Sequence, residues 1–240
     1  MINVRSVAGK PVENKLLLGL PEDSFALLQS ALERVAVPRG KVVYEIGDPF
    51  TKVHFVEAGL VSLLVTSADG VAIEVGLVGP EGMLGVPYLF SEETVLLKHT
   101  TLCSCVFLSI DAKIFKSVIE KFGAGLPMLH QYFRFLLSQA TQIAACNSAH
   151  RLQQRLARWL LMASDRLEAE VVPITHEFLA SILGVQRGGL TIAAGELRRA
   201  GLIRYHHGEI TLLDRKKLEA IACECYQNNR GRFADLVCKG

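Results

Sequence analysis

The chain has 240 residues, half of them hydrophobic, and it carries 26 lysines and arginines against 24 aspartates and glutamates. A chain of this length and composition folds into one large or two smaller domains, which excludes a disordered protein. It has no apolar run of the roughly 18 to 20 residues that cross a bilayer, and its start lacks a secretion signal, so we expect a cytoplasmic protein without a membrane partner.

The charge is spread unevenly along the chain. Residues 1–149 carry 12 basic and 14 acidic residues, whereas residues 150–240 carry 14 basic and 10 acidic residues. Positive charge attracts nucleic-acid phosphates independently of base sequence. We therefore expect any nucleic-acid partner to bind the C-terminal part.

The N-terminal half changes from a helical to a strand-like pattern. Residues 14–35 have apolar residues on one helical face, and Pro21 suits a first helical turn. Short β-rich runs follow at 42–44, 54–56, 60–65, 71–78 and 100–110, separated by glycine- and proline-containing turns. Strands at this spacing predict an antiparallel sandwich, barrel or jelly roll, which we assign to residues 1–124.

A long helix is predicted over residues 125–150. Its apolar residues recur at alternating steps of three and four, as in helices that pair with a copy of themselves. The predicted seam consists of Leu126, Leu129, Phe133, Leu136, Ala140, Ile143 and Asn147, and a second stripe of Tyr132, Leu137, Thr141 and Ala144 is expected to pack on the β domain. We expect a homodimer; the alternative is a helix buried within one chain.

The stretch from Thr175 to Leu197 predicts two short helices joined by a tight turn. Thr175 is a good N-cap, Ala180 leaves room for a second helix to cross closely, and Gly184 suits the positive φ of a sharp turn. The two inner faces consist of Leu179, Ile182 and Leu183 on the first helix, and Val185, Leu190, Ala193, Ala194 and Leu197 on the second. This pattern is typical of a DNA-binding helix-turn-helix, and an ordinary helical hairpin is the alternative.

A two-stranded hairpin is predicted over residues 201–213, with its turn at His206, His207 and Gly208, and the last helix is expected to begin near Asp214 and run past Cys225. A helix-turn-helix followed by a hairpin is a winged helix, which we assign to residues 151–240. The fold class is thus α+β: a β-roll, a long dimerisation helix and a C-terminal winged helix-turn-helix.

The six cysteines are expected to be reduced thiols. Cys103 and Cys105 fall on a predicted strand, and Cys223 and Cys225 fall in a predicted helix, where a spacing of two would separate them. Neither pair has histidines at a zinc-site spacing, so we expect no metal.

The order of these elements resembles the Crp–Fnr family of bacterial transcription regulators over nearly the whole chain. The most specific matches are 175–180 with Gly184 and Val185, and then 200–205; segments 146–150, 158–161 and 223–226 look like a subgroup whose effector is unassigned. The resemblance implies a homodimer that binds double-stranded DNA at two-fold symmetric promoter sites and contacts RNA polymerase. Activation and repression are both open.

The resemblance also implies DNA-contacting residues. Gln186, Arg187, Gly188 and Thr191 would face the major groove, and Arg187 can donate two hydrogen bonds to guanine. The family often has a glutamate where this chain has Gly188, and Gly189 follows, so two potential base contacts are missing. Phosphate contacts are expected from Thr175, Arg204, His206 and His207.

The sensor half departs from the cyclic-nucleotide members of the family. The corresponding effector pocket would include Gly79, Glu81, Gly82, Val95 and Leu96, with Val95 and Leu96 where those members have an Arg-Ser phosphate clamp. An anionic phosphate there would lack its counter-charge, which disfavours cyclic AMP. The chain also lacks the N-terminal cysteines of iron–sulfur members and clear haem ligands, so no cofactor is assigned and the effector is unknown.

A second hypothesis is a β-roll ligand-binding protein or enzyme whose winged helix serves protein contact. The sequence has no Walker loop, no nucleophile-elbow motif, no zinc-protease motif and no dinucleotide fingerprint. We therefore assign no catalytic residue and expect no enzyme.

Overall fold

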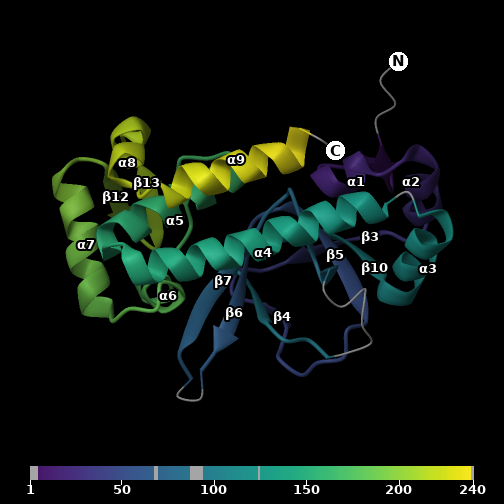
Figure 1. The fold of residues 1–240 in the computed structure, drawn as a ribbon, viewed down its shortest axis with the longest axis horizontal. Helices are drawn as coiled ribbons and strands as arrows, with labels where there is room; N and C mark the ends of the chain where they lie inside the picture. The colour runs from purple at the N-terminus through teal and green to yellow at the C-terminus, as the bar shows by residue number, and fades with distance from the viewer. Residues whose placement is uncertain (1–4, 68–69, 87–93, 124, 239–240) are drawn as a thin grey trace.

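The computed structural model describes residues 5–67, 70–86, 94–123 and 125–238. An N-terminal roll of two four-stranded antiparallel sheets is followed by one long helix and a winged helix at the far end of the molecule (Figure 1). The predicted fold class is confirmed.

The two sheets of the roll pair strands that are distant in sequence. One sheet has the order β3-β10-β5-β8 and the other the order β4-β9-β6-β7. In the first sheet the strands are β3 (Glu33–Val37), β10 (Cys105–Asp111), β5 (Lys52–Ala58) and β8 (Met83–Leu84). In the second they are β4 (Val42–Tyr44), β9 (Lys98–Thr101), β6 (Val61–Thr66) and β7 (Ala72–Val78). A short hairpin of β1 (Ser6–Val7) and β2 (Lys10–Pro11) precedes them.

The N-terminal segment differs from the single helix predicted over residues 14–35. It forms α1 (Lys15–Gly19) and α2 (Glu22–Gln29), and strand β3 takes the remainder. Pro21 separates the helices, because the residue before a proline avoids the helical region and Leu20 is extended at φ −65°, ψ 148°. The strand forms because it pairs with β10, a long-range partner that local periodicity does not reveal.

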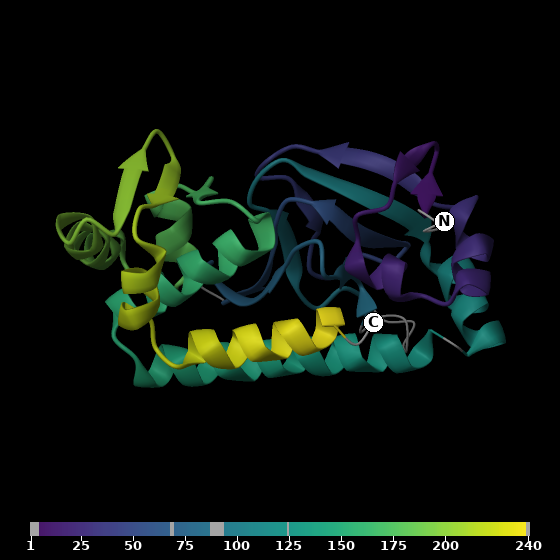
Figure 2. The same cartoon turned by 90° about the horizontal axis from the view of Figure 1, so that it is seen from above.

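Two helices connect the roll to the C-terminal part. Asp111 caps α3 (Ala112–Phe122) by accepting from the backbone N–H groups of Lys113 and Ile114. Helix α4 (Leu126–Ala149) has 24 residues and is therefore about 36 Å long. It runs past the roll to the winged helix, and α9 (Cys225–Cys238) lies alongside it in both views (Figures 1 and 2).

The C-terminal part contains the predicted winged helix and one unpredicted break. Its elements are α5 (Leu152–Leu167), β11 (Val171–Val172), α6 (His176–Ile182), α7 (Arg187–Arg199), β12 (Ile203–His206), β13 (Glu209–Leu212) and α8 (Arg215–Ile221). Asp214 caps α8, which ends at Ile221, so the single last helix that we predicted is wrong. Among the described residues no single helix is long and apolar enough to cross a bilayer; α6 and α7 meet that criterion only when counted together across a sharp bend.

Among the described residues, two large hydrophobic cores hold these elements together. One lies between the first sheet and helices α1 to α4. The other runs without interruption from the second sheet into α5, α6 and α7, and it includes Val61, Leu77, Trp159 and Leu190. The winged helix is therefore packed against the roll.

Polar contacts at this junction join helix α5 to the second sheet. The Trp159 indole donates to Oε1 of Glu74 at 2.7 Å, and the Ser62 hydroxyl donates to Oε2 at 2.6 Å. Burial raises the pKa of Glu74 to about 7 even though these hydrogen bonds oppose the shift. Two turns of α5 further on, Arg166 Nε donates to Glu81 Oε1 at 2.8 Å, and both side chains are buried.

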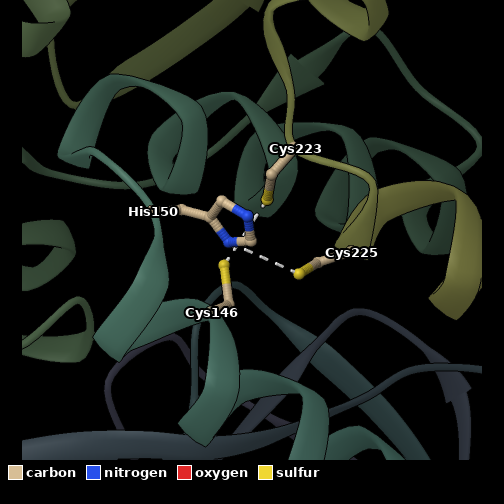
Figure 3. Close-up of side chains that lie close together, drawn as sticks. All are labelled: Cys146, His150, Cys223 and Cys225. Carbon is tan, nitrogen blue, oxygen red and sulfur yellow. Dashed lines mark hydrogen bonds between the residues drawn. The ribbon is translucent and has the colours of Figure 1, made fainter.

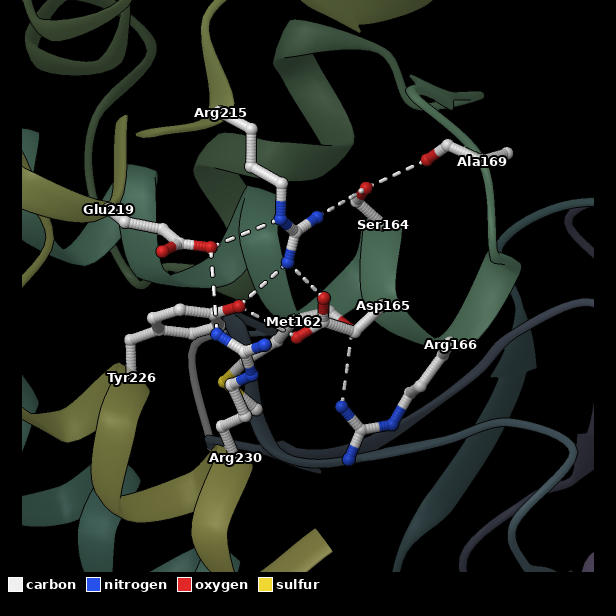
Figure 4. Close-up of polar contacts among 9 residues, drawn as sticks. All are labelled: Met162, Ser164, Asp165, Arg166, Ala169, Arg215, Glu219, Tyr226 and Arg230. Carbon is white, nitrogen blue, oxygen red and sulfur yellow. Dashed lines mark hydrogen bonds and ion pairs between the residues drawn. The ribbon is translucent and has the colours of Figure 1, made fainter. Parts of the chain in front are cut away.

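A second polar network ties α5 to α8 and α9 (Figure 4). The Arg215 guanidinium pairs with Asp165 and with Glu219, and it donates to the Tyr226 hydroxyl at 2.7 Å. Tyr226 in turn donates to Asp165 at 3.0 Å. Helix α5 is therefore fixed on one side to the roll and on the other to the last two helices.

We expect Glu74→Gln to flatten the pH dependence of stability. The glutamate binds its proton more tightly in the folded chain than in the unfolded one, where the pKa is 4.5. Wild-type stability should therefore fall as pH rises from 4.5 through about 7, by on the order of 3 kcal/mol, relative to the glutamine variant. Urea unfolding followed by Trp159 fluorescence between pH 5 and 8 measures this, with the exposed change Glu120→Gln as control. Parallel curves for wild type and Glu74→Gln would refute it.

Candidate nucleic-acid interface and ligand cavity

Helices α6 and α7 form a helix-turn-helix. The Thr175 hydroxyl accepts from the Phe178 backbone N–H at 3.2 Å, which starts α6 as predicted. Gly184 has φ +63° in the turn, and the chain direction changes by 109° between the two helices. This angle lies in the range found between the helices of a helix-turn-helix. Arg155 of α5 donates to the Leu183 carbonyl and so anchors the turn to the protein interior.

Helix α7 has one buried face and one free face. Leu190, Ala193, Ala194 and Leu197 are buried, as predicted. Gln186, Arg187, Gly188 and Thr191 are exposed on the opposite side, and Ile192 beside them is 66% exposed. The Thr191 hydroxyl donates to the Arg187 carbonyl at 2.9 Å, so its methyl group is the part left for a partner. The predicted base-contacting residues therefore share one open surface.

The glycines of α7 are not required by packing. A Cβ at Gly188 would meet nothing within 4 Å, and one at Gly189 would meet only the Leu152 side chain at 3.6 Å. The fold would therefore accept alanine at both positions. The two glycines leave the start of α7 without a side chain at positions 188 and 189.

The wing lies beside the start of α6. Its strands β12 and β13 are joined by a turn in which His207 has φ 45° and Gly208 has φ 79°. Arg204, His206 and His207 are exposed, and the Tyr205 ring packs on the His176 ring with centroids 4.0 Å apart. Burial and the positive charges of Arg187 and Arg198 lower the pKa of His176, which reflects the basic surroundings.

One cation at the wing was missed by the sequence analysis. Arg39 lies in the loop between β3 and β4, yet its Nη1 is 4.0 Å from the position that a Cβ on Gly208 would occupy. The side chain is exposed. No sequence signal could have found it, because it comes from the roll and only the docking of the wing brings it to this surface.

A cavity of about 160 Å³ lies between the roll and helix α4. Its walls are almost entirely apolar: Leu63, Val75, Gly76, Met83, Leu84, Gly85, Leu97, His99, Phe133, Leu136, Leu137 and Ala140. The one titratable side chain among them, His99, is buried, and its Nδ1 has no hydrogen-bond partner. Burial, with a smaller contribution from His54, lowers the pKa of His99 to about 3, so the ring is uncharged near neutral pH.

The five residues predicted for an effector pocket do not line this cavity. Glu81 is committed to Arg166. A Cβ at Gly79 would collide with Glu81 and Arg166, and one at Gly82 would collide with Tyr132, so both glycines serve close packing. Val95 is buried in the core, whereas Leu96 is 62% exposed.

The exposed apolar face of α4 is rotated around the helix relative to the predicted dimer seam. Leu129 and Ile143 are buried within the chain, so these two cannot face a partner, and Leu126 is half-buried against the core that contains Leu129. Tyr132 packs on the roll as predicted, but Leu137, Thr141 and Ala144 of the same stripe are exposed. The free apolar face of α4 consists of Phe133, Leu136, Leu137, Ala140 and Ala144. Asn147 is half-buried at its end.

Strand β7 connects the cavity to the helix-turn-helix. Its residues Val75 and Gly76 line the cavity. At its other end the Ala72 carbonyl accepts from the Ser181 hydroxyl of α6 at 3.1 Å, and Ile73 packs beside Gly184 in the turn. One strand thus contacts both sites.

Comparison with known proteins gives matches over most of the chain. A Crp-like helix-turn-helix domain matches residues 154–221, and a cyclic nucleotide-binding domain matches residues 34–122. Transcriptional regulator SdrP of Thermus thermophilus is 30% identical over 203 residues, which is 79% of this chain and 94% of that protein. Transcriptional regulatory protein btr of Bordetella pertussis is 29% identical over 215 residues, which is 82% of this chain and 84% of that protein. A solved structure of a CRP/FNR-family transcriptional regulator from Thermus thermophilus superposes with a TM-score of 0.56 at 29% identity, covering 79% of this chain and 98% of that one.

We expect Leu137→Asp to break a dimer formed through α4. Leu137 is 56% exposed on the free apolar face, and a carboxylate buried there without a partner is costly. Ile114→Asp on α3, where the isoleucine is 45% exposed, is the matched control and should leave the association unchanged. Sedimentation equilibrium gives the mass of each variant. A Leu137→Asp protein that stays dimeric would exclude this face as the interface.

Proposed function

Because the chain belongs to the Crp/Fnr family of DNA-binding transcription regulators, we propose that it binds two-fold symmetric promoter sites as a homodimer, inserting α7 of each copy into the major groove. The free face of α7, with Arg187 at its first turn and the wing cations beside it, is the observation that carries the proposal. Dimeric action is typical of this family.

Arg187 is the proposed base-reading residue. It is exposed at the first position of α7, and the N-terminal residues of a recognition helix are those that reach base edges. Its guanidinium can donate to O6 and N7 of one guanine. Gly188 contributes no side chain, so we infer that the neighbouring base pair is read weakly.

The wing and the start of α6 supply the proposed phosphate contacts. Thr175, Arg204, His206 and His207 lie around the same edge of the winged helix, and Arg39 adds a cation from the roll. Phosphate contacts fix the register of a protein on the duplex without reading its sequence. A change at Arg39 would therefore weaken binding to all DNA sequences similarly.

The proposed effector of the roll is a small, mainly apolar molecule with one polar group. The cavity walls contain no arginine or lysine among the described residues, and His99 carries no charge. A cyclic phosphate placed there would be desolvated without a counter-charge. The one polar group of the ligand would lie beside His99, the only titratable side chain that the structure describes in the cavity wall.

We propose that a ligand bound in the cavity changes DNA binding by acting on β7 and α4. Strand β7 touches both the cavity and the turn of the helix-turn-helix, and four cavity residues of α4 belong to its free apolar face. A ligand that moves either element would change how the two recognition helices are presented. We further propose that the bound dimer acts by contact with RNA polymerase and has no catalytic role.

We expect Arg187→Ala to lose about 1–3 kcal/mol of binding free energy at one base pair per half-site. Protected sites should be two-fold symmetric with half-sites roughly 34 Å apart, and affinity should fall steeply with salt. Arg199→Ala, at the far end of the same helix, is the control and should keep the base preference. Selection from a random duplex library followed by gel retardation measures both. Equal weakening on every duplex would reduce Arg187 to a phosphate contact.

Cyclic AMP is expected not to stabilise the protein. A ligand present at 100 times its Kd raises the free energy of unfolding by about 2.7 kcal/mol, which a thermal melt detects easily. A melt with cyclic AMP at about 1 mM tests any Kd of about 10 µM or tighter. A saturable rise in melting temperature would contradict the apolar-effector proposal while leaving DNA binding by α7 untouched.

A further inference from the structure

Four potential metal ligands from two distant segments converge at the junction of α4, α8 and α9. Cys146 lies in the last turn of α4 and His150 caps that helix, while Cys223 lies in the loop after α8 and Cys225 is the first residue of α9 (Figure 3). The break between α8 and α9 is what brings Cys223 and Cys225 together. The separation that we predicted for these two thiols is therefore wrong.

The spacing of the ligand atoms fits one tetrahedral ion. All four lie within 4.8 Å of one another, with 3.5 Å between the sulfurs of Cys146 and Cys223 and 3.6 Å between Cys225 Sγ and His150 Nδ1. Metal–sulfur bonds of about 2.3 Å and metal–nitrogen bonds of about 2.0–2.1 Å at a tetrahedral zinc imply edges of about 3.8 Å between two sulfurs and about 3.5 Å between sulfur and nitrogen. These two separations differ from the ideal edges by only a few tenths of an ångström, and no pair of ligand atoms has to close by more than about 1 Å.

The surroundings already hold two of these ligands in place. Glu224 Oε1 lies 3.1 Å from His150 Nε2, so the carboxylate orients the ring and leaves Nδ1 facing the sulfurs. A carboxylate on the other nitrogen is the usual partner of a metal-bound histidine. The Gln142 amide donates to Cys225 Sγ at 3.0 Å, as it would to a thiolate.

The local charge also suits a site with three thiolates. Three thiolates and one divalent ion carry a net charge of −1. Arg155 and Arg158 of α5 are buried nearby, their Nε atoms have no hydrogen-bond partner, and Arg155 interacts electrostatically with the sulfurs of Cys146 and Cys223. These guanidiniums supply the positive charge that the site requires.

We propose that the chain binds one Zn²⁺ ion through three thiolates and one imidazole, from Cys146, Cys223, Cys225 and His150. Soft sulfur ligands and imidazole select zinc over magnesium or calcium, which prefer oxygen, and a closed set of four protein ligands is typical of a structural site. The ion joins the end of the dimerisation helix to the last two helices and so sets the position of the winged helix relative to α4.

The test measures metal in the full-length protein. Protein purified under reducing conditions and assayed by inductively coupled plasma mass spectrometry should contain about one zinc per chain. Cys146→Ser and Cys225→Ser should each lose most of that metal and melt at a lower temperature, because a structural ion stabilises the fold that binds it. Cys103→Ser, a buried cysteine of the roll, is the matched control and should retain the ion.

Two further variants separate ligation from simple damage to the fold. His150→Cys should keep zinc, because four thiolates also bind it tetrahedrally, and Glu224→Gln should weaken metal affinity about 10- to 100-fold without abolishing binding. Wild-type protein stripped with a chelator and titrated with Co²⁺ should develop the visible bands of tetrahedral thiolate-bound cobalt at one equivalent. Because this titration uses the wild-type protein, its result does not depend on whether any variant folds.

The proposal would be overturned if reduced wild-type protein took up neither zinc nor cobalt, or if Cys103→Ser lost as much metal as the ligand variants. It would also be overturned if protein isolated without oxygen contained a Cys146–Cys223 disulfide in place of the ion. Metal content is read independently of DNA affinity, so failure here is distinguishable from failure of α7 to read DNA.

Discussion

Helix α5 is buried along most of its length, and this constrains the position of everything around it. Because three of its buried residues are arginines and one is Trp159, the neighbouring elements have to supply polar partners. Glu74 and Glu81 of the roll accept hydrogen bonds from Trp159 and Arg166. The Leu183 carbonyl in the turn of the helix-turn-helix accepts one from Arg155. An unpaired buried polar group costs more than the contact gains when it is made, so these partners hold the roll and the DNA-reading unit in one arrangement.

Features that are encoded locally were predictable from the sequence. The helix-turn-helix was found because its cap, its turn glycine and its two apolar faces lie within about two dozen residues. Features that need a distant partner were missed. Strand β3 forms because it pairs with β10, and Glu81 accepts a hydrogen bond from Arg166, which is 85 positions away in the sequence. The cysteine cluster was missed for the same reason, since Cys146 and Cys223 are 77 positions apart.

The phase error on α4 has a different physical origin. This helix has three apolar surroundings, namely the roll, helix α9 and the free face, so its apolar residues occupy more of its circumference than a two-helix seam needs. Heptad spacing alone then fits more than one stripe. Two polar residues of α4 determine which stripe faces the roll. Tyr132 donates to the Met83 carbonyl and Gln139 hydrogen-bonds to the backbone of Leu77, so the side of α4 that carries them faces the roll. A glutamine within an apolar helix was the available signal.

The proposed zinc site limits which movements can carry a signal. If the proposed ion joins the end of α4 to the α8–α9 junction, and Arg215 and Tyr226 hold α8 and α9 to α5, then the winged helix and the end of α4 would move as one body. A ligand that moves the winged helix against the roll would then have to shift the contacts of α5 and α6 with β7 and Glu81, which otherwise hold one arrangement. Those contacts adjoin the cavity at Val75 and Gly76. If the metal-bound junction is rigid, a ligand in the cavity would act mainly on the contact between β7 and the turn before α7, and would thereby change the position of α7.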